Sequence, residues 1–96
     1  MNDLSKIPAK SDNITTRFIG DEAVLMNLVT LKTYYLNETA SRIWALTDGA
    51  RSIDSIIRVL TEQYDVPRDE CGDEVSLLLT SLSEEQLINF IEKPET

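Results

Sequence analysis

Residues 34–44, "YYLNETASRIW", change their periodicity in the middle, and this change decides the fold. Residues 34–36 have the aromatic and apolar composition of a β-strand. Directly after them, the Asn37 side chain can accept hydrogen bonds from the free N–H groups of a first helical turn, and Glu38 complements the positive end of the helix dipole. The residues that keep helical i, i+3, i+4, i+7 spacing are Ala40, Ile43, Trp44 and Thr47. The stretch therefore predicts a strand that passes without a loop into a helix over residues 38–47.

Two further strands are predicted before this junction. Residues 14–19, "ITTRFI", are rich in β-branched and aromatic side chains and end at a Gly-Asp turn signal. Residues 23–28, "AVLMNL", form the second strand and residues 33–36 the third, in which Tyr34 and Leu36 share one face. Short strands with tight connections predict a three-stranded antiparallel meander.

Two more helices are predicted after the junction. Ser52 caps the first of them, and Pro67 separates it from the next, because proline is tolerated only in a first helical turn. The core stripe of the last helix consists of Val75, Leu78, Leu79 and Leu82. The final apolar run, "LINFI" at 87–91, favours a strand, although "SEEQ" at 83–86 matches a capping box that would start a short helix instead.

The chain is predicted to form one domain. Its 96 residues suit a single core. We expect residues 14–91 to make up this domain, with a mobile tail at 1–13 and a second tail at 92–96. No apolar run approaches the ~20 residues that span a bilayer, and no signal peptide is apparent, so we expect no membrane partner. A single cysteine fits a cytoplasmic location, since no disulfide can form within the chain.

Composition argues against nucleic-acid binding and against catalysis. The net charge of −8 repels phosphate backbones, and the absence of histidine removes the commonest general base and metal ligand. Cys71 lies among acidic residues that raise a thiol pKa and so lower its reactivity. The acids around it lack the spacing of a calcium loop and are read as a solvated helix face. We therefore expect no enzyme activity, no catalytic residues, no metal and no cofactor.

The edge of the predicted sheet is the feature most open to a partner. The strand in "KTYYL", residues 32–36, would expose unpaired backbone groups, and Lys32 alone is a weak guard against another strand. Such an edge can accept an extended peptide as an added strand. The alternative is that the N-terminal tail or the C-terminal segment covers it. The residues by themselves leave both possibilities open.

The stretch from Ala23 to Ile88 resembles the PqqD-like family of small precursor-peptide recognition domains, which serve bacterial pathways for ribosomally made, modified peptides. The resemblance lies in "AVLMNL", in "YYLNETASRIW", in the "DGAR" stop that follows, and in a leucine-rich last helix closing on "LI". It departs from the family at Leu31 and Gln86, where glycines are common.

The resemblance implies an α+β, winged-helix-like fold in which a three-stranded antiparallel sheet is followed by three helices. It also implies that a leader peptide pairs with the third strand and rests on the third helix. The peptide-binding residues would then be Leu31, Lys32, Thr33, Tyr34 and Tyr35 of the strand and its turn, with Glu74, Leu77 and Ser81 of the helix.

The function expected from this resemblance is that of a non-enzymatic adaptor. It would capture the leader segment of a precursor peptide and present it to a modifying enzyme, such as a radical-SAM enzyme, a cyclase or a leader peptidase. The acidic helix predicts a leader with apolar anchors and basic residues. The alternative is a regulatory winged-helix module that binds another protein or, less favourably for its charge, DNA.

Overall fold

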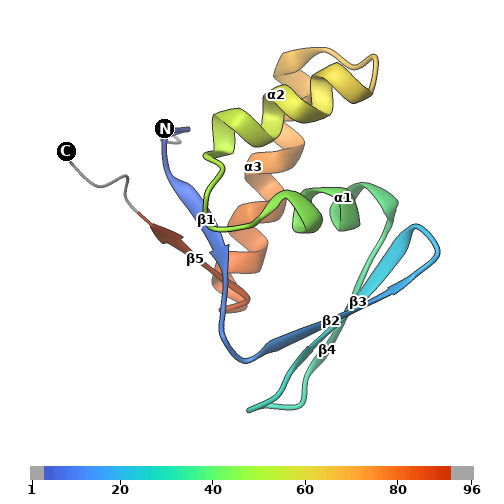
Figure 1. Ribbon diagram of the computed structural model, residues 1–96, viewed down its shortest axis with the longest axis vertical. Helices are drawn as coiled ribbons and strands as arrows, with labels where there is room; N and C mark the ends of the chain where they lie inside the picture. The colour runs from blue at the N-terminus through green and yellow to red at the C-terminus, as the bar shows by residue number, and fades with distance from the viewer. Residues whose placement is uncertain (1–3, 92–96) are drawn as a thin grey trace.

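The computed structural model describes residues 4–91 and is built from two small sheets and three helices (Figure 1). The elements are β1 (Ile7–Lys10), β2 (Ile14–Ile19), β3 (Glu22–Asn27), β4 (Thr33–Leu36), α1 (Glu38–Leu46), α2 (Ile53–Gln63), α3 (Arg68–Glu84) and β5 (Ile88–Ile91). Strands β2, β3 and β4 form an antiparallel sheet in that order, while β1 pairs with β5. The prediction of an α+β fold with a three-stranded sheet followed by three helices is confirmed, and the β1–β5 sheet is added to it.

The direct junction between strand and helix is also confirmed. Strand β4 ends at Leu36, and Asn37 has extended backbone angles (φ −71°, ψ −179°) before α1 begins. The Asn37 Oδ1 atom accepts a hydrogen bond of 2.9 Å from the N–H of Ala40. The buried Ser41 hydroxyl donates back to the Leu36 carbonyl at 3.1 Å. These two bonds fix the direction in which β4 enters the helical body.

The expectation of a mobile N-terminal tail is wrong for the part of it that the structure describes. Strand β1 pairs antiparallel with β5, from Ile7 opposite Ile91 to Lys10 opposite Ile88. Carbonyls of this strand and of the residues just before it accept hydrogen bonds from the start of α2 and the preceding turn: Leu4 from Asp54, Lys6 from Ile53 and Pro8 from Gly49. The segment thus satisfies N–H groups that a helix start leaves open. Residues 1–3 and the expected tail at 92–96 lie outside the described residues.

The C-terminal segment is a strand, as favoured, and no separate short helix begins at residue 83. Helix α3 continues to Glu84, and the chain then turns through Gln86 into β5. Gln86 (φ 62°) and Leu31 (φ 64°) are the non-glycine residues with positive φ in the part of the chain that is described. A left-handed conformation costs an L-residue roughly 1–2 kcal/mol. The two positions at which the resemblance implies glycine therefore keep a backbone shape that glycine favours.

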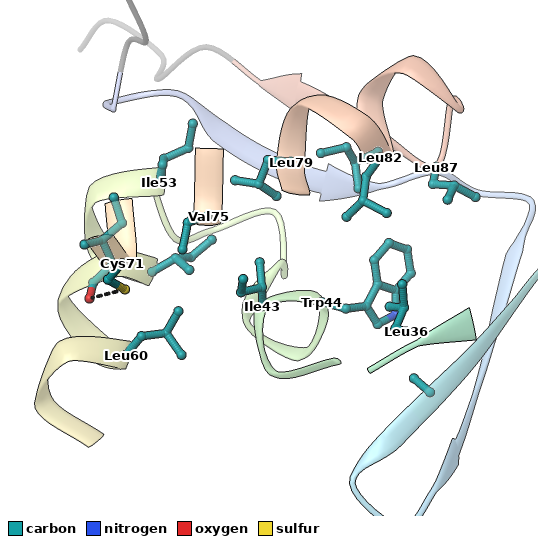
Figure 2. Packing of buried hydrophobic residues seen from close by; sticks show 14 of the residues in the cluster. Leu36, Ile43, Trp44, Ile53, Leu60, Cys71, Val75, Leu79, Leu82 and Leu87 are labelled. Carbon is teal, nitrogen blue, oxygen red and sulfur yellow. Dashed lines mark hydrogen bonds between the residues drawn. The ribbon is translucent and has the colours of Figure 1, made fainter. Parts of the chain in front are cut away.

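One hydrophobic core joins the sheet to the helices (Figure 2). Trp44 is fully buried in the same cluster as Leu36, Leu82 and Leu87, and its Nε1 donates to the Thr16 hydroxyl at 2.9 Å. The predicted stripe of α3 faces this core, with Val75, Leu79 and Leu82 buried and Leu78 half-buried. Helix α1 contacts β3 and β4, whereas α3 contacts α2 and β5. The core thus covers the three-stranded sheet on one face only.

Candidate functional site

Strand β4 is an open edge of the three-stranded sheet. It pairs with β3 on one side, and no other strand within residues 4–91 pairs with its second side. The two segments that could have covered it, near the N- and C-termini, pair with each other instead. The sequence left open whether one of these segments covers the edge of β4, and within the described residues neither of them does.

The register identifies which backbone groups face outward from this edge. The N–H of Asn27 donates to the carbonyl of Lys32 at 3.0 Å. Opposed residues in an antiparallel ladder alternate between bonded and non-bonded pairs. Tyr34, which lies opposite Leu25, therefore bonds to β3 in the same way as Lys32. The N–H and C=O groups of Thr33 and Tyr35 point away from β3, into solvent.

Helix α3 contributes an exposed face near this edge. Glu74, Leu77 and Ser81 are all exposed, and Leu77 is 70% exposed although it is apolar. Exposed apolar side chains next to a free strand edge are candidates for peptide contacts. We call the free edge of β4 together with these three α3 residues the β4–α3 surface.

Tyr34 links the two parts of this surface. Its half-buried side chain shares the inner face of β4 with Leu36, and its hydroxyl donates to the Glu85 Oε1 atom at 3.0 Å, at the C-terminal end of α3. Partial burial, the hydrogen bond to Glu85 and the charge of that carboxylate all raise the pKa of the Tyr34 phenol. The strand edge and the end of α3 are therefore in direct contact.

Not every predicted site residue directs its side chain toward α3. Because side chains alternate along a strand, Thr33 and Tyr35 project from the outer face of the sheet, away from the helices. Tyr35 is 81% exposed there, and Leu31 is exposed in the turn before β4. For Thr33 and Tyr35, the groups available to a strand partner at the edge are those of the backbone.

A cleft between the three helices was not expected from the sequence. It has a volume of about 190 Å³ and lies between the first turns of α1, the end of α2 and the first half of α3. Ile43, Leu60 and Val75 line it, together with the acidic residues Glu38, Glu70 and Glu74. Glu74 belongs to both the cleft and the β4–α3 surface, so the two are continuous. The acids were visible in the sequence, but the meeting of three helices was not.

Arg42 places a positive charge at this cleft. The Arg42 guanidinium lies over the Tyr64 ring, 5.8 Å from the ring centre, and both residues line the cleft. Such a contact between a cation and an aromatic face is attractive. It orders one wall of the cleft without neutralising its acids, since no ion pair joins Arg42 to them among the described residues.

Cys71 lies at the base of the same cleft. Its Sγ contacts the Ile57 carbonyl at 3.9 Å (Figure 2). Burial, followed by the nearby charge of Glu74, raises the pKa of the thiol, while Arg68 opposes the shift. The sequence had indicated the direction of the shift, but burial rather than charge is its main cause. A thiol with a raised pKa is a poor nucleophile at neutral pH.

The described residues hold no group of three or more histidine, cysteine, aspartate or glutamate side chains arranged to bind a metal. Among the helices of residues 4–91, none is both long enough and apolar enough to cross a membrane.

These features define a winged-helix-like domain with an unpaired strand edge beside an acidic helix. The chain belongs to the PqqD family: the family model described as coenzyme PQQ synthesis protein D matches residues 22–88. Comparison with curated proteins gave no significant match.

Two solved structures share the fold closely. The first is TbiB1 in complex with the TbiA(beta) leader peptide, with a TM-score of 0.79 and 27% identity over 84% of this chain and 94% of that one. The second is a lasso peptide synthetase B1 complexed with the leader peptide, with a TM-score of 0.77 and 23% identity over 85% of this chain and 96% of that one. The comparisons do not favour the alternative of a regulatory winged-helix module.

Proposed function

We propose that the protein is an adaptor that captures the leader segment of a precursor peptide as a fourth strand of its three-stranded sheet. The observation that carries this proposal is the unpaired edge of β4, where the N–H and C=O groups of Thr33 and Tyr35 face solvent beside α3. Its family and its likeness to TbiB1, which was solved with a leader peptide, support the same conclusion.

Backbone pairing alone does not account for stable capture. Hydrogen bonds to the four free groups of Thr33 and Tyr35 contribute about 0.5–1.5 kcal/mol each. Association costs an estimated 4–15 kcal/mol in lost freedom, so these bonds at most offset the lower end of that cost. Side-chain anchors must supply the rest. The exposed Leu77 and the apolar cleft that begins at Glu74 are the surfaces available for them.

The charge around these anchors selects the kind of leader. Glu38, Glu70 and Glu74 line the cleft, with Arg42 as the cationic residue beside them. A leader with apolar anchors and basic residues complements this pattern. The peptide-contacting residues proposed are Leu31, Lys32, Thr33, Tyr34, Tyr35, Glu74, Leu77 and Ser81. Added salt should weaken the complex, because attraction between exposed charges is screened.

The catalytic partner in this proposal is a separate protein. The chain itself offers a buried thiol with a raised pKa and no histidine, which suits a binding role better than chemistry. A radical-SAM enzyme, a cyclase or a leader peptidase would act on the core of the captured peptide. The whole complex would work in the cytoplasm.

The test is an NMR titration of the isotopically labelled protein with the leader segment of the precursor peptide encoded in the same gene cluster. We expect the largest amide shifts at Thr33 and Tyr35, whose N–H groups gain partners, and along 74–81 of α3. A repeat at higher salt should show weaker binding. If the β4 amides stay unchanged at saturating peptide, strand addition at this edge is refuted.

A further inference from the structure

The hydrogen bond between Tyr34 and Glu85 joins β4 to the C-terminal end of α3. Within residues 4–91, it is the only hydrogen bond or ion pair that joins the three-stranded sheet to α3 and its C-terminal cap. The other side-chain bonds from this sheet to a helix, from Trp44 to Thr16 and from Ser41 to the Leu36 carbonyl, both involve α1. The spacing between β4 and α3 thus depends on the apolar core and on this one polar bond.

The backbone is held firmly at both ends of the bond. On the strand side, the Tyr34 backbone lies opposite the buried Leu25, and its rigid ring leaves the hydroxyl few positions. On the helix side, the N–H of Glu85 donates to the Ser81 carbonyl at 3.1 Å. Directly after it, the N–H of the buried Leu87 donates to the Leu82 carbonyl at 2.9 Å. A hydrogen bond between side chains on two anchored backbones limits how far the elements that carry them can move apart.

We propose that Tyr34 and Glu85 are a positioning pair, which holds β4 and α3 at the separation that the leader peptide requires. This inference rests on the proposed function. A peptide that adds to the edge of β4 must hydrogen-bond to Thr33 and Tyr35 while its side chains reach Leu77 on α3. Both sets of contacts form together only when the two elements are correctly spaced. Tyr34 lies on the inner face of the strand, so the added strand does not displace it.

Matched variants separate the bond from its surroundings. Tyr34→Phe removes the hydroxyl, and Thr15→Val is its control, because it removes an exposed hydroxyl from β2, outside the proposed peptide-contacting residues. Glu85→Ala removes the acceptor, whereas Glu85→Gln keeps an amide oxygen that can accept. Glu84→Gln removes the same charge from the neighbouring exposed position and controls for electrostatics.

The first measurement is the affinity for the leader peptide of the same gene cluster, by fluorescence anisotropy. We expect Tyr34→Phe and Glu85→Ala to bind about fivefold more weakly, as suits the loss of one exposed hydrogen bond. Thr15→Val should bind as the wild type does, and Glu85→Gln should match Glu84→Gln. If Glu85 acted by its charge alone, the amide in Glu85→Gln would not restore the affinity that Glu85→Ala loses. Equal or tighter binding by Tyr34→Phe would overturn the inference.

A second measurement does not depend on the peptide. Nitroxide labels at Thr33→Cys and Thr80→Cys, in a Cys71→Ser background, report the β4–α3 distance by electron paramagnetic resonance. The distribution should broaden with Tyr34→Phe and stay narrow with Thr15→Val. An unbroadened distribution overturns the positioning role even if the wild type binds its leader. Failure of the wild type to bind any leader overturns the proposed function, and the inference with it.

Discussion

Replacement of Tyr35 by proline should weaken capture of the leader at least about tenfold while leaving the fold intact. The N–H of Tyr35 points away from β3, so a proline at this position removes no hydrogen bond within the protein. Proline is tolerated on edge strands for this reason. Its fixed φ of about −65° departs from that of an ideal antiparallel strand, and this strain should cost about 1 kcal/mol of folding free energy. A domain of this size has roughly 5–14 kcal/mol to spare.

The effect on binding should be much larger than the effect on folding. The substitution removes one main-chain donor, worth about 0.5–1.5 kcal/mol, and leaves the opposing peptide carbonyl without a partner, at a cost of about 1–3 kcal/mol. Together these losses amount to at least about tenfold in affinity. Tyr35→Thr is the matched control. It removes the ring, which lies on the outer face of the sheet, but keeps the N–H, so its affinity should change little.

Isothermal titration with the leader peptide, alongside urea unfolding of each variant, provides the assay. Tyr34→Pro completes the set, because Tyr34 bonds to β3 and its replacement should destabilise the whole sheet. If Tyr35→Pro and Tyr35→Thr bind the leader equally well, the peptide does not pair with the edge of β4. The reasoning from the register would then be refuted even though the fold is unchanged.

Two further predictions concern α3 and the turn before α2. Leu77→Ala should weaken leader binding but change stability by less than about 0.5 kcal/mol, whereas Leu79→Ala, at a buried position, should cost about 2–5 kcal/mol in urea unfolding. The backbone N–H groups of Arg51 and Ala50 lower the pKa of Asp48. Because this pKa is lower in the folded state than its usual value of 3.8, the unfolded chain binds the proton first as the pH falls. Stability should therefore decline below about pH 4, and Asp48→Asn should reduce that decline in unfolding curves between pH 2 and 5.

Much of the candidate site follows from local patterns in the sequence. The spacing of apolar residues on α3 separates the buried Leu79 from the exposed Leu77, and alternation along β4 separates Leu36 from Tyr35. These distinctions depend only on residues a few positions apart. The hydrogen bond between Tyr34 and Glu85 cannot be predicted from such local patterns. Its partners are 51 positions apart, and neither side chain stands out in its own segment.

The N-terminal segment, which was expected to be a mobile tail, is a second feature that local sequence patterns do not predict. Residues 7–10, "IPAK", contain a proline and no strong strand pattern, so their local preference is weak. They become a strand because β5, from the opposite end of the chain, offers them a partner. Pairing with a distant segment outweighs local propensity wherever that propensity is small.

The sequence by itself determined the order of strands and helices from β2 onward, the loopless junction at Asn37, the faces that enter the core and the absence of histidine chemistry. These properties rest on periodicity, capping and composition, which act over one or two turns of chain. The tertiary structure alone decided that β1 pairs with β5 rather than with β4, that three helices enclose a cleft, and that Tyr34 meets Glu85. Each of these brings together segments far apart in sequence, and the edge of β4 stays free because its possible partners are paired with each other.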